Sequence, residues 1–187
     1  MNFVTDATKP HLGGNIQGGD PATYCPDLWN WLIPTFNIRN ILDVGCGEGH
    51  STDYFREKGC NVIGIEGLQC NAKVAKSPIL VADIEAGPIV FENIDLVWCC
   101  EFVEHVANVK NVLDTICVGR ILAITHADVK QSGHHHVNCQ PKEYWIKLIE
   151  ERGYLYDEAL TTNAKRLCPV RRNHFSWHGL IFVRNKV

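Results

Sequence analysis

Short, almost wholly apolar segments recur along the chain and alternate with longer amphipathic segments. Short apolar runs that end at turns are typical of strands covered on both faces. Seven segments have this character: residues 40–44, 61–65, 79–82, 94–100, 118–125, 154–156 and 178–184. Because strands and helices alternate, we expect an α/β fold, with a doubly wound, mostly parallel seven-stranded sheet and helices on both faces.

Three amphipathic segments are predicted to be helices between the strands. The first covers residues 51–58 and ends at Gly59, the residue type that most often follows a helix. In the second, apolar residues are spaced by four and three positions, which is the period of a helix: Phe102, Val106, Val109, Leu113 and Ile116. The third begins with Pro141 in the first helical position and ends at Gly153.

Glycine and proline dominate the segment before the first strand, which argues against a long helix or strand there. These residues are Gly13, Gly14, Gly18, Gly19, Pro21 and Pro26. We interpret residues 18–24 as a lid that folds over a ligand, and we expect a short amphipathic helix over residues 26–33. The chain therefore divides into residues 1–39, a lid and short helix, and residues 40–187, which hold the α/β domain.

The composition is that of a single folded domain. Of the 187 residues, 45% are hydrophobic and 21% are charged, which excludes a disordered chain, a collagen-like chain and a coiled coil. No apolar run approaches the roughly 18 residues of a membrane span, and residues 1–10 lack the pattern of a secretory signal. The nine cysteines are odd in number and form no CxxC pair, so we expect a reduced, cytoplasmic protein.

Positive charge is concentrated at the end of the chain. The formal net charge is only −3, which does not indicate a broad nucleic-acid surface. After Glu158 there is no acidic residue, and the basic residues are Lys165, Arg166, Arg171, Arg172, Arg184 and Lys186. This end is either a solvated basic face or a site for an anionic substrate group or a phosphate backbone.

The strongest chemical signal is the glycine-rich stretch at residues 45–49 (GCGEG), which follows the first strand and opens a helix. Glycines at such a turn permit positive φ and let a ligand approach the backbone closely. A dinucleotide fingerprint would have Gly or Ala at position 50, where this chain has His50, and the GK[ST] of a P-loop is missing. Asp43 precedes the loop, and its carboxylate would repel a pyrophosphate but suits a cationic ligand.

Two further carboxylates end the next two strands. Glu66 can accept hydrogen bonds from both hydroxyls of a ribose, and Asp83 can accept one from the exocyclic amine of an adenine. In an open α/β sheet, ligands bind beyond the carboxyl ends of the strands. Three acids at successive strand ends beside one glycine loop therefore favour a nucleoside ligand that carries a positive charge.

In their order along the chain, these motifs resemble those of class I S-adenosylmethionine-dependent methyltransferases. The resemblance rests on DVGCGEG at 43–49, Glu66, Asp83-Ile84 and EFVEHV at 101–106, and covers residues 40–125. It implies a class I methyltransferase fold and an enzyme whose cofactor is S-adenosyl-L-methionine, with S-adenosyl-L-homocysteine as product. By position in the motifs, it implies these cofactor-binding residues: Asp43, Gly45, Cys46, Gly47, Glu66, Gly67, Asp83, Ile84, Cys100 and Glu101.

Histidines gather on the side where a methyl acceptor would enter. His126 follows the fifth strand, and residues 133–138 (GHHHVN) lie in the next loop. Such histidines can act as a general base, as hydrogen-bond partners of the substrate or as metal ligands. A metal in this loop would need His126, Asp128 or His105 to join, and we expect none. The candidate catalytic residues are His105, His126, His135 and His136. His105 follows Glu101 by four residues, on the same side of the predicted helix.

Three functions remain open at this point. The first is methyl transfer to a hydroxyl of a small molecule or glycan. The second is methylation of a nucleic acid or nucleotide through the basic C-terminal segment, although the chain lacks the [DNS]PP[YFW] motif of amino-methylating DNA enzymes and a Pro-Cys dipeptide for cytosine C5. The third is a catalytically idle S-adenosylmethionine-binding partner protein. We expect the first, with a small-molecule or saccharide substrate and no membrane partner.

Overall fold

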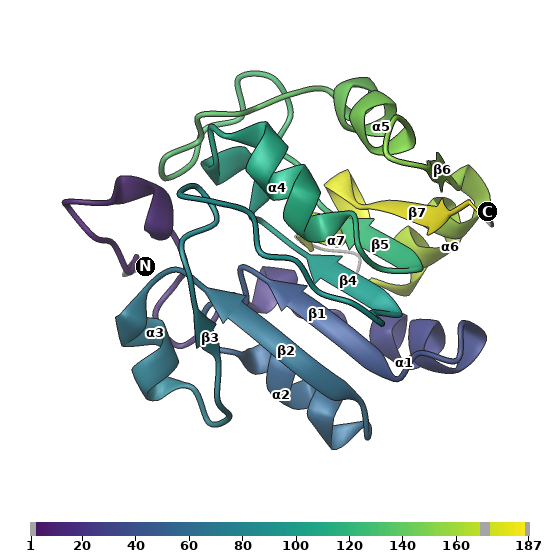
Figure 1. Cartoon of the computed structure of the whole chain (residues 1–187), viewed down its shortest axis with the longest axis horizontal. Helices are drawn as coiled ribbons and strands as arrows, with labels where there is room; N and C mark the ends of the chain where they lie inside the picture. Colours follow the sequence, from purple (N-terminus) through teal and green to yellow (C-terminus); the bar gives the residue numbers. More distant parts are fainter. Residues whose placement is uncertain (1–2, 169–172, 186–187) are drawn as a thin grey trace.

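The computed structural model describes residues 3–168 and 173–185 of the chain. Within them, seven strands form one sheet in the order β3-β2-β1-β4-β5-β7-β6 (Figure 1). The strands are β1 (Asn40–Val44), β2 (Asn61–Glu66), β3 (Leu80–Val81), β4 (Leu96–Cys99), β5 (Ile121–Ile124), β6 (Tyr154–Tyr156) and β7 (Leu180–Arg184). Strands β1 to β5 pair in parallel, whereas β7 runs antiparallel to both β5 and β6. The mostly parallel seven-stranded sheet predicted from the sequence is confirmed.

Helices cover both faces of this sheet (Figure 1). One face packs against α1 (Pro26–Thr35), α2 (His50–Glu57), α6 (Glu158–Leu167) and α7 (His174–His178), and the other against α4 (Val109–Ile116) and α5 (Lys142–Glu150). Along each strand, neighbouring residues alternate between the two cores, as Ile41 and Leu42 do. A short helix, α3 (Gln69–Val74), lies beside β2 and β3. This double cover explains why the strands are continuous apolar runs.

The helix predicted over residues 102–116 is wrong in its first half. The chain turns sharply after β4, where Glu101 has a positive φ of 53°, and Val103–His105 forms a single 3-10 turn, η3. Helix α4 begins only after Asn108, whose side chain accepts a hydrogen bond from an amide of the first turn. Glu101 and His105 therefore do not share a helix face, contrary to the prediction.

Other boundaries differ from the prediction by shorter distances. Helix α5 starts at Lys142, so Pro141 precedes the helix instead of occupying its first position. Strand β3 has only two residues, and His178 ends α7 instead of beginning the last strand. Across residues 3–168 and 173–185, every helix is too short or too polar to cross a membrane.

The N-terminal segment, residues 3–24, lies near the carboxyl ends of the parallel strands (Figure 1). It contains two 3-10 turns, η1 (Pro10–Leu12) and η2 (Pro21–Thr23), and an isolated antiparallel bridge joins Phe3 to Ile16. Residues of this segment line the same cavity as the strand ends. The segment therefore lies where the predicted lid would have to be.

Candidate active site

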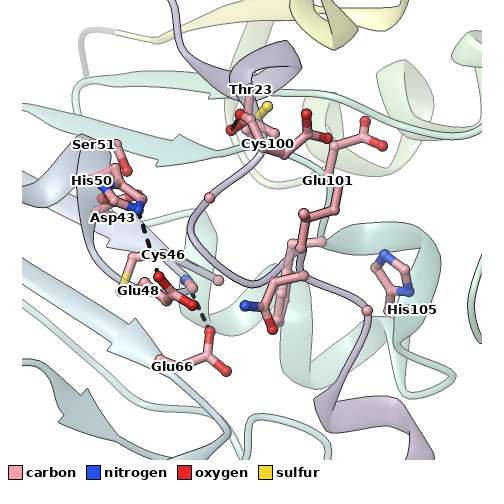
Figure 2. A pocket seen from close by; sticks show the side chains of 18 of the residues that line it. Thr23, Asp43, Cys46, Glu48, His50, Ser51, Glu66, Cys100, Glu101 and His105 are labelled. Carbon is pink, nitrogen blue, oxygen red and sulfur yellow. Dashed lines mark hydrogen bonds and ion pairs between the residues drawn. The ribbon is translucent and has the colours of Figure 1, made fainter. Parts of the chain in front are cut away.

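A cavity of about 1030 Å³ lies at the carboxyl ends of the strands, against the N-terminal segment (Figure 2). All ten residues that the resemblance assigned to the cofactor line it. Parallel α/β sheets bind their ligands at this edge. The volume is at the upper end of the roughly 300–1,000 Å³ found for small-molecule sites, so it can hold a nucleoside cofactor together with a second small molecule.

The glycine loop has the backbone conformation that its composition predicts. Gly45, Gly47 and Gly49 all have positive φ, at 70°, 56° and 82°. A Cβ at position 45 would lie 2.6 Å from a ring carbon of Phe102, so a side chain there is excluded by contact. At position 47 the nearest atom to a Cβ would be 3.7 Å away, because this glycine faces open space within the cavity.

Asp43 lies under the glycine loop and is almost completely buried. Ser51 and Thr52, at the start of α2, each donate a hydroxyl hydrogen bond of 2.6 Å to its Oδ2. Burial raises the pKa of Asp43 to about 6, and the two hydroxyl hydrogen bonds oppose part of that rise. The carboxylate therefore ties the end of β1 to the start of α2, at the base of the loop.

Glu66, at the end of β2, holds the glycine loop through the backbone amide of Gly47. Its Oε2 accepts a hydrogen bond of 2.9 Å from the amide of Gly47, and its Oε1 accepts one of 2.9 Å from the amide of Leu68. Burial raises the pKa of Glu66, although the hydrogen bonds it accepts lower it. Each carboxylate oxygen has a second lone pair, so the side chain can still accept hydrogen bonds from a ribose.

Asp83 is already engaged by the N-terminal segment. Its carboxylate lies 3.0 Å from Nζ of Lys9 and 3.1 Å from Nε2 of His11. Burial raises the pKa of Asp83, but its hydrogen bonds to Lys9 and His11 outweigh this and lower the pKa overall. Leu12 also covers Gly67, where a Cβ would come within 2.5 Å of the leucine side chain. The proposed adenine end of the cavity is thus covered by residues 9–12.

His174 joins the N-terminal segment to the turn after β4. Its Nε2 lies 3.2 Å from Oδ2 of Asp20, and its Nδ1 lies 3.2 Å from Oε2 of Glu101. Burial lowers the pKa of His174, but the two carboxylates outweigh it and raise the pKa overall. Sequence reasoning did not place His174 in this cavity, because Asp20 and His174 are 154 positions apart. The one sequence feature that pointed to a binding role for His174 was its place in the basic C-terminal segment.

Two of the four candidate catalytic histidines line the cavity, namely His105 from η3 and His136 from the loop before α5. Their ring centroids are 5.0 Å apart in an edge-to-face arrangement. Burial lowers the pKa of His105 to about 4, with smaller contributions from neighbouring histidines, and burial also lowers the pKa of His136. His134, which was not among the candidates, lines the cavity as well.

The other two candidates lie elsewhere. Among the described residues, neither His126 nor His135 belongs to the cavity lining. His126 is buried at the end of β5, with its Nδ1 3.8 Å from Asp128 and its ring 5.5 Å from that of His178. His135 has a positive φ of 47° and lies beside His11. Their catalytic roles stay predictions, without support from this arrangement.

The basic C-terminal segment is only partly within the described residues, since Arg171, Arg172 and Lys186 lie outside them. Lys165 donates a hydrogen bond of 3.1 Å to the carbonyl of Trp177. Arg184 donates one of 3.0 Å to the carbonyl of Val118. These two cations therefore already have partners within the fold.

Residues 42–122 match the family described as "Methyltransferase domain". The chain carries a class I S-adenosylmethionine-dependent methyltransferase domain. All ten residues assigned to the cofactor fall inside the matched segment of this methyltransferase domain. Their individual roles stay predictions.

Curated relatives of the methyltransferase domain are distant. The chain is 34% identical over 88 residues to a ubiquinone biosynthesis O-methyltransferase of Bartonella quintana. The aligned segment covers 42% of this chain and 35% of that protein. It is 26% identical over 121 residues to a trans-aconitate 2-methyltransferase of Delftia acidovorans, and this aligned segment covers 56% of this chain and 44% of that protein. The chain spans less than half the length of these two relatives.

Solved structures show the same fold. A plantazolicin methyltransferase in complex with S-adenosylhomocysteine (SAH) has a TM-score of 0.61 at 14% identity, covering 87% of this chain and 83% of that chain. The magnesium protoporphyrin IX methyltransferase of Synechocystis with bound S-adenosylmethionine (SAM) has a TM-score of 0.59 at 16% identity, covering 83% of this chain and 76% of that chain. At these identities, the likeness shows the fold alone.

Proposed function

We propose that the methyltransferase domain transfers the methyl group of SAM to a hydroxyl of a small molecule or saccharide. The observation that carries the proposal is the cavity itself, which joins the ten residues assigned to the cofactor to a wall lined by histidines. The names of the distant relatives support it, because two of the proteins that share this sequence pattern are named O-methyltransferases.

In this reaction the acceptor oxygen attacks the methyl carbon in line with the carbon–sulfur bond. The oxygen–carbon bond forms and the carbon–sulfur bond breaks. The electron pair of the broken bond returns to sulfur, which leaves neutral SAH, and the hydroxyl proton passes to a base or to solvent. The protein therefore contributes mainly by aligning the two reactants and by assisting proton removal.

The acidic groups of the cavity suit a cationic cofactor. Asp43, Glu66 and Glu101 come from the ends of three neighbouring strands or the turns after them (Figure 2). A sulfonium cation is attracted by this field, whereas a phosphate would be repelled by it. The free lone pairs of Glu66 are positioned beside the glycine loop, where they can accept hydrogen bonds from a ribose.

The acceptor would bind on the histidine side of the cavity. His105 and His136 line this wall, so we assign proton removal to it. Two described cations of the basic C-terminal segment, Lys165 and Arg184, donate to backbone carbonyls, which supports a small acceptor over a nucleic acid, whereas Arg166 is exposed on α6. A phosphate backbone would need such cations to be free.

A turnover screen tests the proposal. The protein is incubated with SAM and, one class at a time, with hydroxylated metabolites, monosaccharides and short RNA oligonucleotides, and SAH is measured together with the methylated product. We expect SAH to form with a hydroxyl compound at a rate that salt changes little. Turnover with RNA alone, falling steeply as salt rises, would replace the small acceptor by a nucleic acid. Cofactor binding without turnover on any class would favour the idle binding protein.

A further inference from the structure

A loop and a turn are held together on the histidine side of the cavity. The backbone carbonyl of Glu104, in η3, accepts hydrogen bonds of 3.0 Å from the amides of Val137 and Asn138. The side chain of Asn138 donates in return to the carbonyls of Val103 and Val106, at 3.3 and 3.4 Å. These four bonds fix the position of His136, which directly precedes Val137, against η3.

Three side chains converge where the loop and the turn meet. Glu104, His105 and His136 each offer one ligand atom, and these atoms all lie within 4.8 Å of one another. Glu104 is completely buried, and neither of its carboxylate oxygens has a hydrogen-bond partner. Nδ1 of His105 is also buried without a partner. Buried polar atoms are nearly always satisfied, so this group of unpartnered atoms requires a ligand or a proton.

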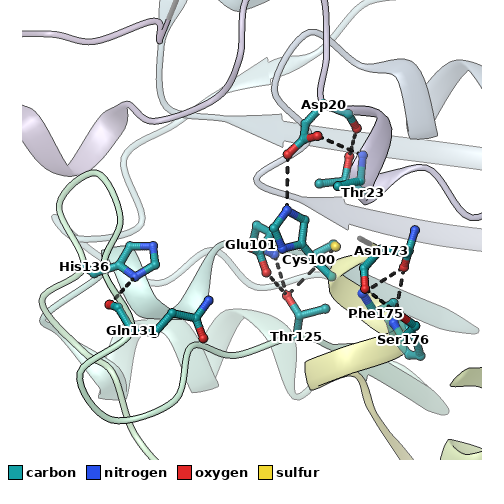
Figure 3. Close-up of polar contacts among 12 residues, drawn as sticks. Asp20, Thr23, Cys100, Glu101, Thr125, Gln131, His136, Asn173, Phe175 and Ser176 are labelled. Atoms are coloured by element: carbon teal, nitrogen blue, oxygen red, sulfur yellow. Dashed lines mark hydrogen bonds and ion pairs between the residues drawn. The ribbon is translucent and has the colours of Figure 1, made fainter. Parts of the chain in front are cut away.

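The protonation of His136 is fixed by its neighbour. Its Nδ1 lies 3.1 Å from the carbonyl oxygen of Gln131 (Figure 3). Because a carbonyl can only accept, Nδ1 carries the hydrogen, and Nε2 keeps its lone pair. A histidine that binds a metal is commonly held in this way, with its other ring nitrogen donating to a backbone carbonyl.

We infer that Glu104, His105 and His136 form a binding site for a divalent first-row transition-metal ion. Two imidazoles and one carboxylate are a ligand set for such ions and leave coordination positions open for other ligands. Both imidazoles line the cavity, so an open position would face the acceptor. Cys139, whose Sγ is 3.7 Å from Nδ1 of His136, lies on the side of the ring that faces Gln131.

A second group of three ligands differs from this site. His126, Asp128 and His178 also converge, but Asp128 is exposed and is already paired with both histidines at 3.8 and 3.5 Å. An exposed carboxylate beside two histidines is satisfied by them and by water. Glu104 also lies beside two histidines, but it is completely buried and neither of its carboxylate oxygens has a hydrogen-bond partner, and this difference decides between the two groups. Asp128 therefore provides a matched control.

A metal at this site would act on the acceptor, a consequence that rests on the proposed function. An acceptor hydroxyl bound to a divalent cation loses its proton more readily, and the proton passes to solvent. The oxygen that remains is the nucleophile that forms the bond to the methyl carbon. With a metal bound, His105 and His136 would promote proton removal on this wall as its ligands and would not take the proton themselves.

Metal binding can be measured without any substrate. The purified protein, kept reduced, is treated with a chelator, and Co²⁺ is then titrated while its visible absorption and bound stoichiometry are recorded. We expect one equivalent to bind, with at least about tenfold weaker binding in Glu104→Gln and in His136→Ala. Asp128→Asn and Cys139→Ser should bind Co²⁺ as the unchanged protein does. Circular dichroism in chelator checks that each variant is folded, and His136→Ala, in a loop, keeps the test decisive if Glu104→Gln does not fold.

Three results would overturn the inference. These are no stoichiometric binding of Co²⁺, binding that neither Glu104→Gln nor His136→Ala weakens, and binding that Asp128→Asn abolishes. SAH affinity is measured on the same samples. Co²⁺ binding without SAH binding would contradict the proposed function and leave the metal site standing, whereas SAH binding without Co²⁺ binding would remove the metal site alone.

Discussion

Asp43 is the residue at which burial and charge conflict most clearly. It is sealed under the glycine loop, and its pKa is raised to about 6 by burial. In the unfolded chain this pKa is near 3.8. Because the folded pKa is the higher one, the group favours the folded state when it is protonated. That contribution is present at low pH and is lost as pH rises from about 4 through about 6.

Replacing Asp43 by Asn should remove this pH dependence. The unfolding free energy of Asp43→Asn minus that of the unchanged protein should therefore rise between pH 4 and pH 7 by about 2 kcal/mol, which is most of the roughly 3 kcal/mol that a shift of about two pKa units is worth. Urea unfolding followed by circular dichroism at several pH values measures the difference. Glu92→Gln, at an exposed position, is the control and should show a difference that stays flat. A flat difference for Asp43→Asn would mean that its pKa is not raised.

At the residue scale, the sequence predicted which residues would line the cofactor cavity, but it did not predict which side chains contact one another across it. Asp43, Glu66 and Asp83 were predicted from their places near strand ends and the other cofactor residues from the resemblance, and the edge of the parallel sheet brings all ten to one cavity. His174 and Glu104 were missed for a physical reason. His174 enters the site through partners distant in sequence, and nothing in a linear pattern shows that a glutamate between Val103 and His105 is completely buried.

The N-terminal segment is the element on which access to the cavity depends. Lys9 and His11 hold it to Asp83, the carboxylate that the resemblance assigns to the adenine. Lys9 is half exposed, so each contact contributes little, and an exposed pair is worth about 0–1 kcal/mol. The segment and a bound adenine would therefore compete for one carboxylate, and weak contacts let the segment give way.

Two variants separate the roles of this element. Asp83→Asn should increase hydrogen exchange in residues 4–16 about two- to fivefold and should also weaken SAH binding. The double variant Lys9→Met with His11→Gln should increase exchange by a similar factor but leave SAH binding as strong or make it stronger. Exchange by mass spectrometry and calorimetric titration give the two readouts. Loss of SAH binding in the double variant would show that the segment supports the ligand instead of competing with it.

At the element scale, apolar runs predicted strands well, because burial on both faces leaves a clear signal. The start of α4 was predicted wrongly because Phe102 and Val106 have helical spacing by chance, while the cap at Asn108 decides where the helix begins. Helices α3, α6 and α7 were not predicted. α6 has polar residues on most positions, and α7 has only five residues, so neither carries a long apolar stripe.

At the scale of the whole molecule, the fold assembles the cavity from both of its cores. Trp98, on β4, packs edge-to-face on Trp29 of α1 at 5.5 Å between centroids and stacks on Phe175 of α7 at 5.1 Å. Phe175 directly follows His174, so this aromatic contact positions the histidine that meets Asp20 and Glu101. The N-terminal and C-terminal parts of the chain are thereby joined to the strand ends that hold the glycine loop.

Calorimetric titration of SAH tests the central claim, that this cavity holds the cofactor, most directly. Gly47→Ala and Gly59→Ala both place a Cβ at a positive φ, of 56° and 84°, but only Gly47 faces the cavity, and a Cβ at Gly59 meets no atom within 4 Å. Both variants should lose a similar amount of stability, about 1 kcal/mol. The unchanged protein and Gly59→Ala should bind one SAH at about micromolar affinity, and Gly47→Ala should bind at least about tenfold more weakly. No binding by the unchanged protein, or equal binding by the two variants, would contradict the account.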